Sequence, residues 1–365
     1  MNCELGGMKQ PEIWYAVLNW GLGHASRSAP LIEALEQRGY RVRLASDGAA
    51  LDWLRARFPH LPYWELPAYQ ARYARHWPAW AALVPQLPRL ARRARAEHRF
   101  LARCLQAHPA PQALISDNRL GWQAPGQRSL YLSHQFQLAA PPFSQLATAL
   151  HRHYWRSFAV LAVPDAPDSP LAGKLARPPA SWGERLYWLG PLSHLAGRPE
   201  LKSRASANHQ GPLRITAVLS GPEPQRSLLE GLLTAQAQGL PQYKWTLVRG
   251  REGTYGGWPG PVYERLGSEA LAAVLAQTDV VVGRSGYSSL MDYQQAQLPA
   301  VLIPTPGQGE QEYLAAYHAG QGHAVAARQG QLDLSGHIRA ALKAPGWPTV
   351  QKPSWEGLFG FLEGK

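Results

Sequence analysis

At 365 residues the chain is long for one hydrophobic core, which favours two domains. Its net charge of +12 suits an anionic partner, such as a phosphorylated substrate, an anionic bilayer or nucleic acid. It has no run of roughly 18 apolar residues and no secretory leader, so we expect a cytoplasmic protein without a membrane span. Cys3 and Cys104 stand outside any metal-spaced cluster, so we expect no zinc site and no structural disulfide.

Apolar strands alternate with helical segments through the first half of the chain. A strand at 12–18 leads through a glycine loop into a helix at 25–38, which has apolar residues on one face. A strand, a glycine loop and a helix in this order open a doubly wound fold of the Rossmann type. The further strands that we expect in a first domain of residues 1–194 are 40–45, 113–116, 129–133 and 159–163.

The same plan begins again after a polar stretch at 195–211, which we interpret as a linker. A strand at 213–219 and a helix at 225–237 open a second domain at 212–351. The tail at 352–365 is amphipathic, and we expect it to pack back on the first domain. The predicted fold class is therefore α/β, with two Rossmann-like doubly wound domains that face a central cleft.

Residues 278–315 hold the pattern that is most specific to a function. An apolar strand at 280–282 ends in Arg-Ser-Gly, and the helix that follows carries an acid on its second turn. A helix N-terminus with small residues and an arginine suits a phosphate, and the acid is placed to hold the hydroxyls of a ribose. A second apolar strand at 300–303 leads to a loop that carries a Gln-Glu pair. The donor-binding residues predicted here are Arg284, Ser285, Gly286, Asp292, Gln311 and Glu312.

His24 follows the glycines of the first loop directly, and it is our candidate general base. Gly21 and Gly23 let the backbone approach a ligand closely, so we assign them to the acceptor site. Asp117 follows a neighbouring strand, where a carboxylate can orient an imidazole and stabilise its charged form. The alternatives are a histidine bonded to the helix backbone and an aspartate in a turn.

A nicotinamide dinucleotide site is another reading of this loop. That site needs a third glycine, but Ser26 stands at its position. Asp47 ends the second strand and could imitate the acid that binds the ribose in a dehydrogenase. We favour a different use, since a histidine at this point is better placed for proton transfer or for binding a diphosphate.

Polar residues follow other strands of both domains. His134 and Gln135 end a first-domain strand, and we predict that they contact the acceptor. In the second domain, Ser220 and Gly221 form a strand-to-helix loop that could face a phosphate. Arg249 ends the next strand, where it could stack on a base or hydrogen-bond to it.

The order of these motifs resembles the donor site of the MurG-type glycosyltransferases of family 28, which attach N-acetylglucosamine to a lipid-linked muropeptide. It is similar more broadly to GT-B enzymes, including transferases that glycosylate diacylglycerol. The resemblance implies that the Arg-Ser-Gly turn contacts the donor phosphates, that Asp292 replaces a ribose-binding glutamate, and that the pair at 311–312 reaches the sugar. In the first domain, Gly23 and His24 match the end of the family's glycine-rich loop.

These features predict an inverting glycosyltransferase that moves a sugar from a nucleotide diphosphate sugar, UDP-linked, to a lipid-linked or other membrane-proximal acceptor. The chain lacks the glutamate pair of retaining enzymes and an Asp-x-Asp motif, so we expect inversion without a metal or cofactor. A helix dipole and an arginine would then stabilise the leaving diphosphate. Two other hypotheses stay open on this fold, a nucleotide-sugar 2-epimerase and a non-catalytic nucleotide-sugar-binding protein.

Residues 63–103 are rich in aromatic side chains and arginine. Tryptophans beside cations suit a membrane interface, so we predict a peripheral contact with an anionic bilayer on the inner face of the plasma membrane. The alternatives are a helical hairpin with a solvated basic face and, third, single-stranded nucleic acid, although the chain matches no known nucleic-acid module. The side chains concerned are Trp64, Tyr69, Tyr73, Trp77, Trp80, Arg89, Arg92, Arg93, Arg95, Arg99 and Arg103.

Overall fold

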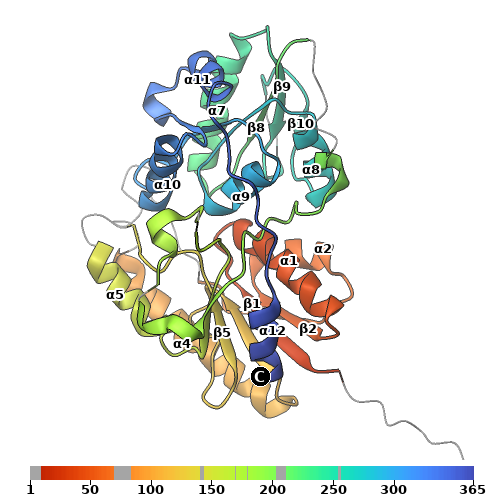
Figure 1. Cartoon of the computed structure of the whole chain (residues 1–365), viewed down its shortest axis with the longest axis vertical. Helices are drawn as coiled ribbons and strands as arrows, with labels where there is room; N and C mark the ends of the chain where they lie inside the picture. Colours follow the sequence, from red (N-terminus) through yellow and green to blue (C-terminus); the bar gives the residue numbers. More distant parts are fainter. Residues whose placement is uncertain are drawn as a thin grey trace, which may run out of the picture.

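The computed structural model describes residues 10–69, 84–139, 144–168, 170–178, 180–202, 211–253 and 256–365. These residues form two α/β domains, one above the other in Figure 1, and each is built on one parallel sheet. The two sheets and the α/β class agree with the fold predicted from the sequence.

The first sheet has the strand order β3-β2-β1-β4-β5-β6-β7, and every neighbouring pair is parallel. Its central strands are apolar runs because helices cover both faces of a parallel sheet. The strands are β1 (Glu12–Val17), β2 (Arg41–Ser46), β3 (Tyr63–Glu65), β4 (Ala113–Asp117), β5 (Ser129–Leu132), β6 (Val160–Val163) and β7 (Leu186–Trp188). The helices are α1 (Gly23–Gln37), α2 (Gly48–Arg57), α4 (Leu87–Ala107) and α5 (Ser144–Trp155), with 3₁₀ turns η1 (Val84–Gln86), η2 (Gly173–Ala176) and η3 (Ala180–Arg185).

The second sheet has the order β10-β9-β8-β11-β12-β13, again with parallel pairs throughout. A short helix, α6 (Pro199–Lys202), comes before it in the chain. Its strands are β8 (Arg214–Val218), β9 (Lys244–Val248), β10 (Val262–Tyr263), β11 (Val280–Gly283), β12 (Ala300–Leu302) and β13 (Val325–Ala326). Its helices are α7 (Gln225–Gln238), α8 (Ser268–Ala276), α9 (Tyr287–Gln295), α10 (Gly309–Gly320) and α11 (Leu334–Ala341), with the 3₁₀ turn η5 (Gln329–Gln331).

Each sheet reverses the direction of its strand order at one place, between β1 and β4 in the first sheet and between β8 and β11 in the second. In open α/β sheets, ligands bind outside the carboxyl ends of the strands at this switch point. The helices that follow β1 and β11 are α1 and α9, and both lie at the junction of the domains (Figure 1). They touch there, because the Ser288 hydroxyl donates to the Gly23 carbonyl at 2.9 Å.

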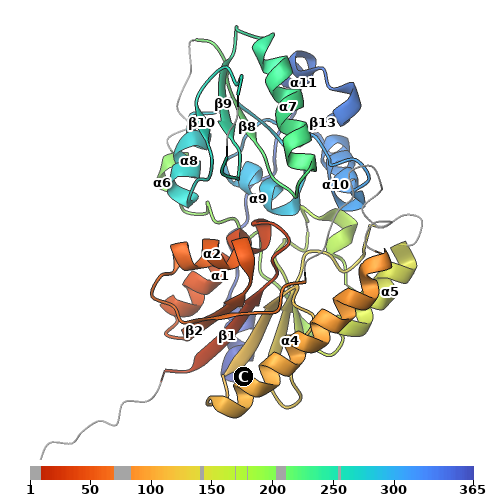
Figure 2. The same cartoon turned by 180° about the vertical axis from the view of Figure 1, so that it is seen from behind.

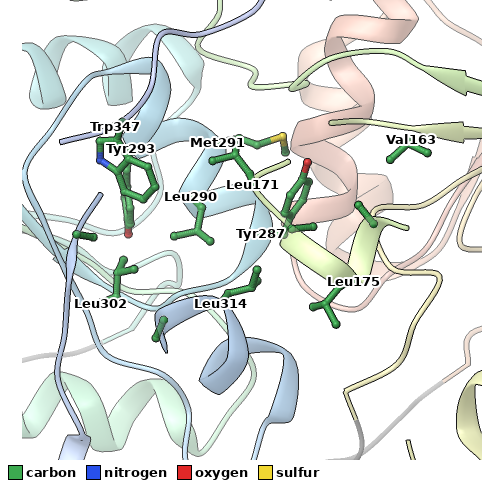
Figure 3. Close-up of a cluster of buried hydrophobic side chains, with 14 of the residues drawn as sticks. Val163, Leu171, Leu175, Tyr287, Leu290, Met291, Tyr293, Leu302, Leu314 and Trp347 are labelled. Carbon is green, nitrogen blue, oxygen red and sulfur yellow. The ribbon is translucent and has the colours of Figure 1, made fainter. Parts of the chain in front are cut away.

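One buried apolar cluster continues from one domain into the other (Figure 3). Leu171 and Leu175 enter it from the first domain, and Leu290 and Leu314 enter it from the second. Tyr287 lies between the two groups, and its hydroxyl donates to the Pro164 carbonyl. The closed arrangement of the domains is therefore stabilised by apolar burial as well as by hydrogen bonds.

The last helix, α12 (Glu356–Glu363), lies against the first domain beside β1 (Figure 1). Leu358 and Leu362 are fully buried in the core around β1, β2 and α1. The Gln112 side-chain amide donates to the Leu362 carbonyl at 2.7 Å, which satisfies one of the acceptors at the end of the helix. The chain therefore crosses to the second domain and then returns to the first.

The basic aromatic region divides into a buried part and an exposed part. The Trp64 ring meets Trp14 edge-on, with centroids 4.7 Å apart, and Tyr69 is 5% exposed. Tyr69 is therefore a core residue and Trp64 is partly buried against the core, which corrects the prediction that these two side chains face a membrane. On α4, Arg92, Arg95, Arg99 and Arg103 are exposed. Tyr73, Trp77 and Trp80 lie outside the described residues. Among the helices described, none is long and apolar enough to cross a membrane.

Candidate active site

His24 and Asp117 meet at the switch point of the first sheet. His24 is the second residue of α1, and Asp117 ends β4 directly opposite Val17 of β1. The His24 Nδ1 lies 2.7 Å from an oxygen of the fully buried Asp117 carboxylate, while the imidazole is 14% exposed. A carboxylate in this position can orient the ring and stabilise the imidazolium that forms when the ring takes a proton.

Arg27 lies one turn further along α1 and is 2% exposed. Its Nε donates to Asp117 at 2.8 Å, and its Nη2 donates to the other oxygen of the same carboxylate. Although burial alone would raise it, the neighbouring Arg27 and His24 hold the pKa of Asp117 well below its usual range. Burial, followed by the charge of Arg27, lowers the pKa of His24 from the ordinary imidazole value.

His134 connects this cluster to the second domain. Its Nδ1 lies 2.6 Å from Nη1 of Arg27, and its Nε2 lies 3.0 Å from a carboxylate oxygen of Glu310, near the start of α10. The imidazole stacks on the Tyr287 ring, with centroids 4.1 Å apart and planes within 6°. Burial lowers the pKa of His134, because the Glu310 carboxylate only partly offsets the loss of solvent.

The N-terminus of α9 leaves space beside the residue that precedes its first turn. Gly286 precedes the helix in an extended conformation, and a Cβ built there would meet no atom within 4 Å. The free amides of the first turn carry a partial positive charge, which suits a phosphate. In contrast, a Cβ on Gly23 would lie 2.8 Å from the Ser288 hydroxyl, so glycine is needed where α1 approaches α9.

Arg284 does not occupy the place that the sequence predicted. Its guanidinium is completely buried and donates to the carbonyls of Ile303, Pro304 and Gln225 and to the Gln329 side chain, at 2.8–3.1 Å. It therefore ties the ends of β11 and β12 together and does not reach into the cleft. Burial among neutral groups lowers its pKa to about 10.

Asp292 faces the segment that joins the two domains. One of its oxygens accepts a hydrogen bond from the Ser193 hydroxyl at 2.7 Å, and the other lies 3.3 Å from Nε2 of His194. The carboxylate is 13% exposed. A ribose bound by Asp292 would therefore replace the Ser193 hydroxyl with one of its own.

The other predicted donor residues line the carboxyl ends of the second sheet, mostly through backbone contacts. The Ser285 hydroxyl donates to the Gln311 carbonyl at 2.7 Å, and the Gln311 side-chain oxygen accepts from the Thr305 amide at 2.9 Å. Glu312 accepts from the Gly307 amide at 2.8 Å. Both side chains thus hold the loop between β12 and α10 at the edge of the cleft.

Ser220, Gly221 and Arg249 lie at the ends of β8 and β9. The Gly221 carbonyl accepts hydrogen bonds from Arg226, and the residue has a φ of +92°, which favours glycine. Arg249 is fully buried, and its Nε donates to Glu230 at 2.9 Å, so it does not present its guanidinium to a base as the sequence suggested.

In the first domain, Gly21 also has a φ of +92°, and a Cβ there would have open space around it. Gln135 is held through its backbone, whose amide and carbonyl both bond to the Ser133 hydroxyl. Asp47 forms an ion pair with the buried Arg119 and accepts from Asn19, which leaves it engaged within the domain. The dehydrogenase alternative at Asp47 therefore gains no support from its position.

Within the part of the chain that the structure describes, no group of three or more His, Cys, Asp or Glu side chains could hold a metal ion. The arrangement at the junction is a buried cation and carboxylate beside a partly exposed imidazole, opposite a helix N-terminus. Such a set can remove a proton from a hydroxyl and stabilise negative charge that develops across the cleft.

A comparison with known protein families gives one match at this point of the chain. Residues 268–344, which include β11, α9 and α10, match the glycosyltransferase family 28 C-terminal domain. This part of the chain is similar to the C-terminal domain of the family 28 glycosyltransferases, and the matched segment includes Gly286, Asp292 and Gln311.

Solved structures show how far the chain shares its fold with known proteins. MurG of Acinetobacter baumannii is 14% identical with a TM-score of 0.57, and the match covers 98% of this chain and 100% of that one. A glycotransferase of kitacinnamycin is 18% identical with a TM-score of 0.64, over 98% and 95% of the two chains. The spinosyn rhamnosyltransferase SpnG, solved with thymidine diphosphate, is 15% identical with a TM-score of 0.59, over 92% and 90%. These likenesses show that the fold is GT-B. No curated protein sequence matches.

Three residues of the cluster around His24 and Asp117 were missed in the sequence. Arg27, Tyr287 and Glu310 join the cluster in the structure, although none was singled out beforehand. For Arg27 a signal was available, since a residue three positions after His24 lies on the same face of a helix. For Tyr287 and Glu310 there was none, because their partner His134 belongs to the other domain.

Proposed function

We propose that the protein is an inverting, metal-independent glycosyltransferase that uses a UDP-linked sugar, with His24 as the general base. One observation carries this proposal: the His24–Asp117 pair lies at the switch point of the first sheet and faces the N-terminus of α9, at the switch point of the second. A base on one wall and an anion-binding helix end on the other are what direct displacement from a nucleotide sugar requires.

In this reaction the hydroxyl of the acceptor attacks the anomeric carbon of the sugar. His24 accepts the hydroxyl proton at Nε2 as the new C–O bond forms and the bond to the diphosphate oxygen breaks. Asp117 holds the imidazole and stabilises its positive charge. The amides at the start of α9 stabilise the negative charge on the departing nucleotide diphosphate, while Asp292 binds its ribose and Gln311 and Glu312 contact the sugar.

For the acceptor, we propose a lipid-linked hydroxyl at an anionic membrane surface on the cytoplasmic side. Two features support this choice. Arg92, Arg95, Arg99 and Arg103 recur at helical spacing on α4 and are exposed. Nearby on the same flank of the first domain (Figure 2), α5 exposes Leu146 and Leu150, at 61% and 49%. Cations beside exposed leucines suit a headgroup layer better than free solution.

The donor and the base are tested together with wild-type protein and the variant His24→Gln. We expect calorimetry against a panel of nucleotide sugars to show binding of a UDP-sugar to both proteins with similar Kd. With an acceptor lipid, His24→Gln should lose about 10²- to 10⁴-fold in kcat. The exposed His60, which pairs with Glu36 far from the cleft, gives the matched control His60→Gln.

The pH profile gives a further check on His24. The base works only when neutral, so activity should fall as the pH drops through the His24 pKa. Because burial and then Arg27 lower that pKa below 6.5, the acid limb of kcat/KM should also lie below 6.5. An unchanged rate in His24→Gln would contradict the assignment of the base. Formation of a new nucleotide sugar from the donor alone would indicate the 2-epimerase instead.

A further inference from the structure

Arg27 makes an unusual set of contacts for an arginine in the first turns of a helix. A cation near a helix N-terminus is unfavourable, and this one is also removed from solvent. Asp117 compensates by accepting from both Nε and Nη2. The remaining terminal nitrogen, Nη1, is then directed at the imidazole of His134. The same guanidinium therefore touches Asp117, His24 and His134.

The contact with Arg27 determines which ring nitrogen of His134 carries the proton. A guanidinium can only donate hydrogen bonds, so His134 Nδ1, at 2.6 Å from Nη1, must accept. The other nitrogen, Nε2, lies 3.0 Å from Glu310, whose carboxylate can only accept. Although burial alone would raise it, the proximity of His134 keeps the pKa of Glu310 below its usual value. His134 is thereby neutral with its proton on Nε2.

His24 has the opposite arrangement. Its Nδ1 lies 2.7 Å from Asp117, which is ionised, so Nδ1 carries the proton and donates. Arg27 Nη2 also lies 2.9 Å from this Nδ1, but Asp117 is closer and, because it is ionised, can only accept, so Nδ1–H donates to Asp117. The lone pair of His24 is consequently on Nε2, the nitrogen left for a hydroxyl proton.

We propose that Arg27 is a positioning residue that holds the two cleft histidines in opposite neutral tautomers, His24 as the proton acceptor and His134 as a donor to Glu310. The role of His24 rests on the proposed function, whereas the tautomers do not. His134 cannot replace His24 as the base, because both of its nitrogens are engaged. Its donation to Glu310 also joins α10 to the first domain across the cleft.

The tautomers can be read directly, without any substrate. Long-range ¹H–¹⁵N correlation spectra of protein labelled with ¹⁵N-histidine distinguish a proton on Nδ1 from one on Nε2. The signals are assigned by their loss in His24→Gln and His134→Gln. We expect the wild-type protein to show Nδ1–H for His24 and Nε2–H for His134. An Nδ1–H signal for His134 in wild-type protein would overturn the proposal, and this measurement needs no Arg27 variant to fold.

Two variants then test the cause. Arg27→Met removes the donor to His134. Arg27→Lys keeps the charge but replaces the planar guanidinium, which donates in several directions, with a single ammonium group. In whichever folds, Glu310 still holds the proton on Nε2, so we expect His134 to take up a second proton, on Nδ1, at a higher pH than in the wild-type protein, because Nδ1 no longer accepts from Arg27. We expect kcat to fall roughly 10²-fold, with the donor Kd unchanged. Arg38→Met, at the other end of α1 and paired with Glu363, is the control that should change neither. A His134 that takes up its second proton at the same pH in a folded Arg27 variant as in the wild-type protein would overturn the proposal.

The two proposals fail in different ways. If no transfer is found with any donor but the tautomers are as expected, the proposed function fails and the role of Arg27 stands. If His24→Gln abolishes transfer but His134 is not Nε2–H, the role of Arg27 fails alone.

Discussion

At the residue scale, Arg284 supports the site by bonding to neighbouring protein groups, and we do not expect it to contact the substrate. Replacing it with methionine leaves four buried acceptors without their donor, including the carbonyls of Ile303 and Pro304. Loss of the buried cation removes a desolvation cost and offsets part of this penalty. We expect Arg284→Met to lower the free energy of unfolding by about 1–3 kcal/mol, measured by urea denaturation.

The control for Arg284→Met is Arg339→Met on α11, where the arginine is exposed and bonds to Ser335. We expect it to change stability by less than about 0.5 kcal/mol. Calorimetry with the donor tests the alternative. A loss of donor affinity of tenfold or more in Arg284→Met, with stability unchanged, would show that the guanidinium contacts the phosphates after all.

The sequence predicted which residues lie near the cleft better than which residues they contact. His24 and Asp117 were placed near each other because polar residues that follow neighbouring parallel strands share one edge of the sheet. The direction of Arg284 could not be inferred in this way. Whether a strand-end arginine turns into the cleft or back over the sheet depends on the carbonyls of Ile303 and Pro304, which directly follow β12 and come 19 and 20 residues later in the chain.

At the scale of single elements, α12 contributes to the core of a domain that the chain left long before. Leu358 has no exposed surface and packs in the same cluster as Ile13 and Leu31. Truncating it leaves a cavity that the surrounding sheet and helices can only partly fill. We expect Leu358→Ala to lower the free energy of unfolding by about 2–5 kcal/mol, measured by thermal or urea denaturation.

Glu356, on the exposed side of the same helix, gives the matched control Glu356→Ala. Equal stabilities of the two variants would mean that α12 is not docked in solution. The amphipathic pattern of the tail was visible in the sequence, but the surface that it covers was not. That surface is formed by strands and by α1 at the opposite end of the chain, which no local pattern connects to it.

In the basic aromatic region, too, the sequence did not show which side chains are buried. Its composition is compatible with a membrane-facing segment and with a core segment, because tryptophan and tyrosine serve both. In the structure, α4 has one buried face and one exposed face. The buried residues recur every three or four positions, at Ala94, Glu97, Leu101 and Cys104, with exposed arginines between them. Trp64 lies on a strand, where Trp14 and Trp122 surround it.

At the scale of the whole molecule, the net charge of +12 raises the question of where the positive charge acts. We expect binding to phosphatidylglycerol-containing vesicles in a sedimentation assay, weaker at higher salt. The double variant Arg95→Glu with Arg99→Glu should weaken it by at least about tenfold, since each basic residue near an anionic surface contributes about 1 kcal/mol.

A second double variant tests whether vesicle binding depends on the α4 arginines themselves or on the net charge of the whole protein. Arg265→Glu with Lys343→Glu makes the same change in net charge on the exposed surface of the second domain. We expect it to retain most of the vesicle binding. Equal losses in the two double variants would mean that only the overall charge matters, and binding to neutral vesicles alone would exclude the α4 arginines as the contact.

The return of the chain through α12 has a consequence for how the protein is made. Ribosomal synthesis proceeds from the N-terminus, and domains generally fold as units as they emerge. Here the first sheet emerges first, but the side chains of Leu358 and Leu362 that complete its core are translated after the whole second domain. The nascent first domain therefore keeps an open apolar slot until α12 has emerged, so a ribosome that stalls after α11 leaves behind a folded second domain attached to an unfinished first domain.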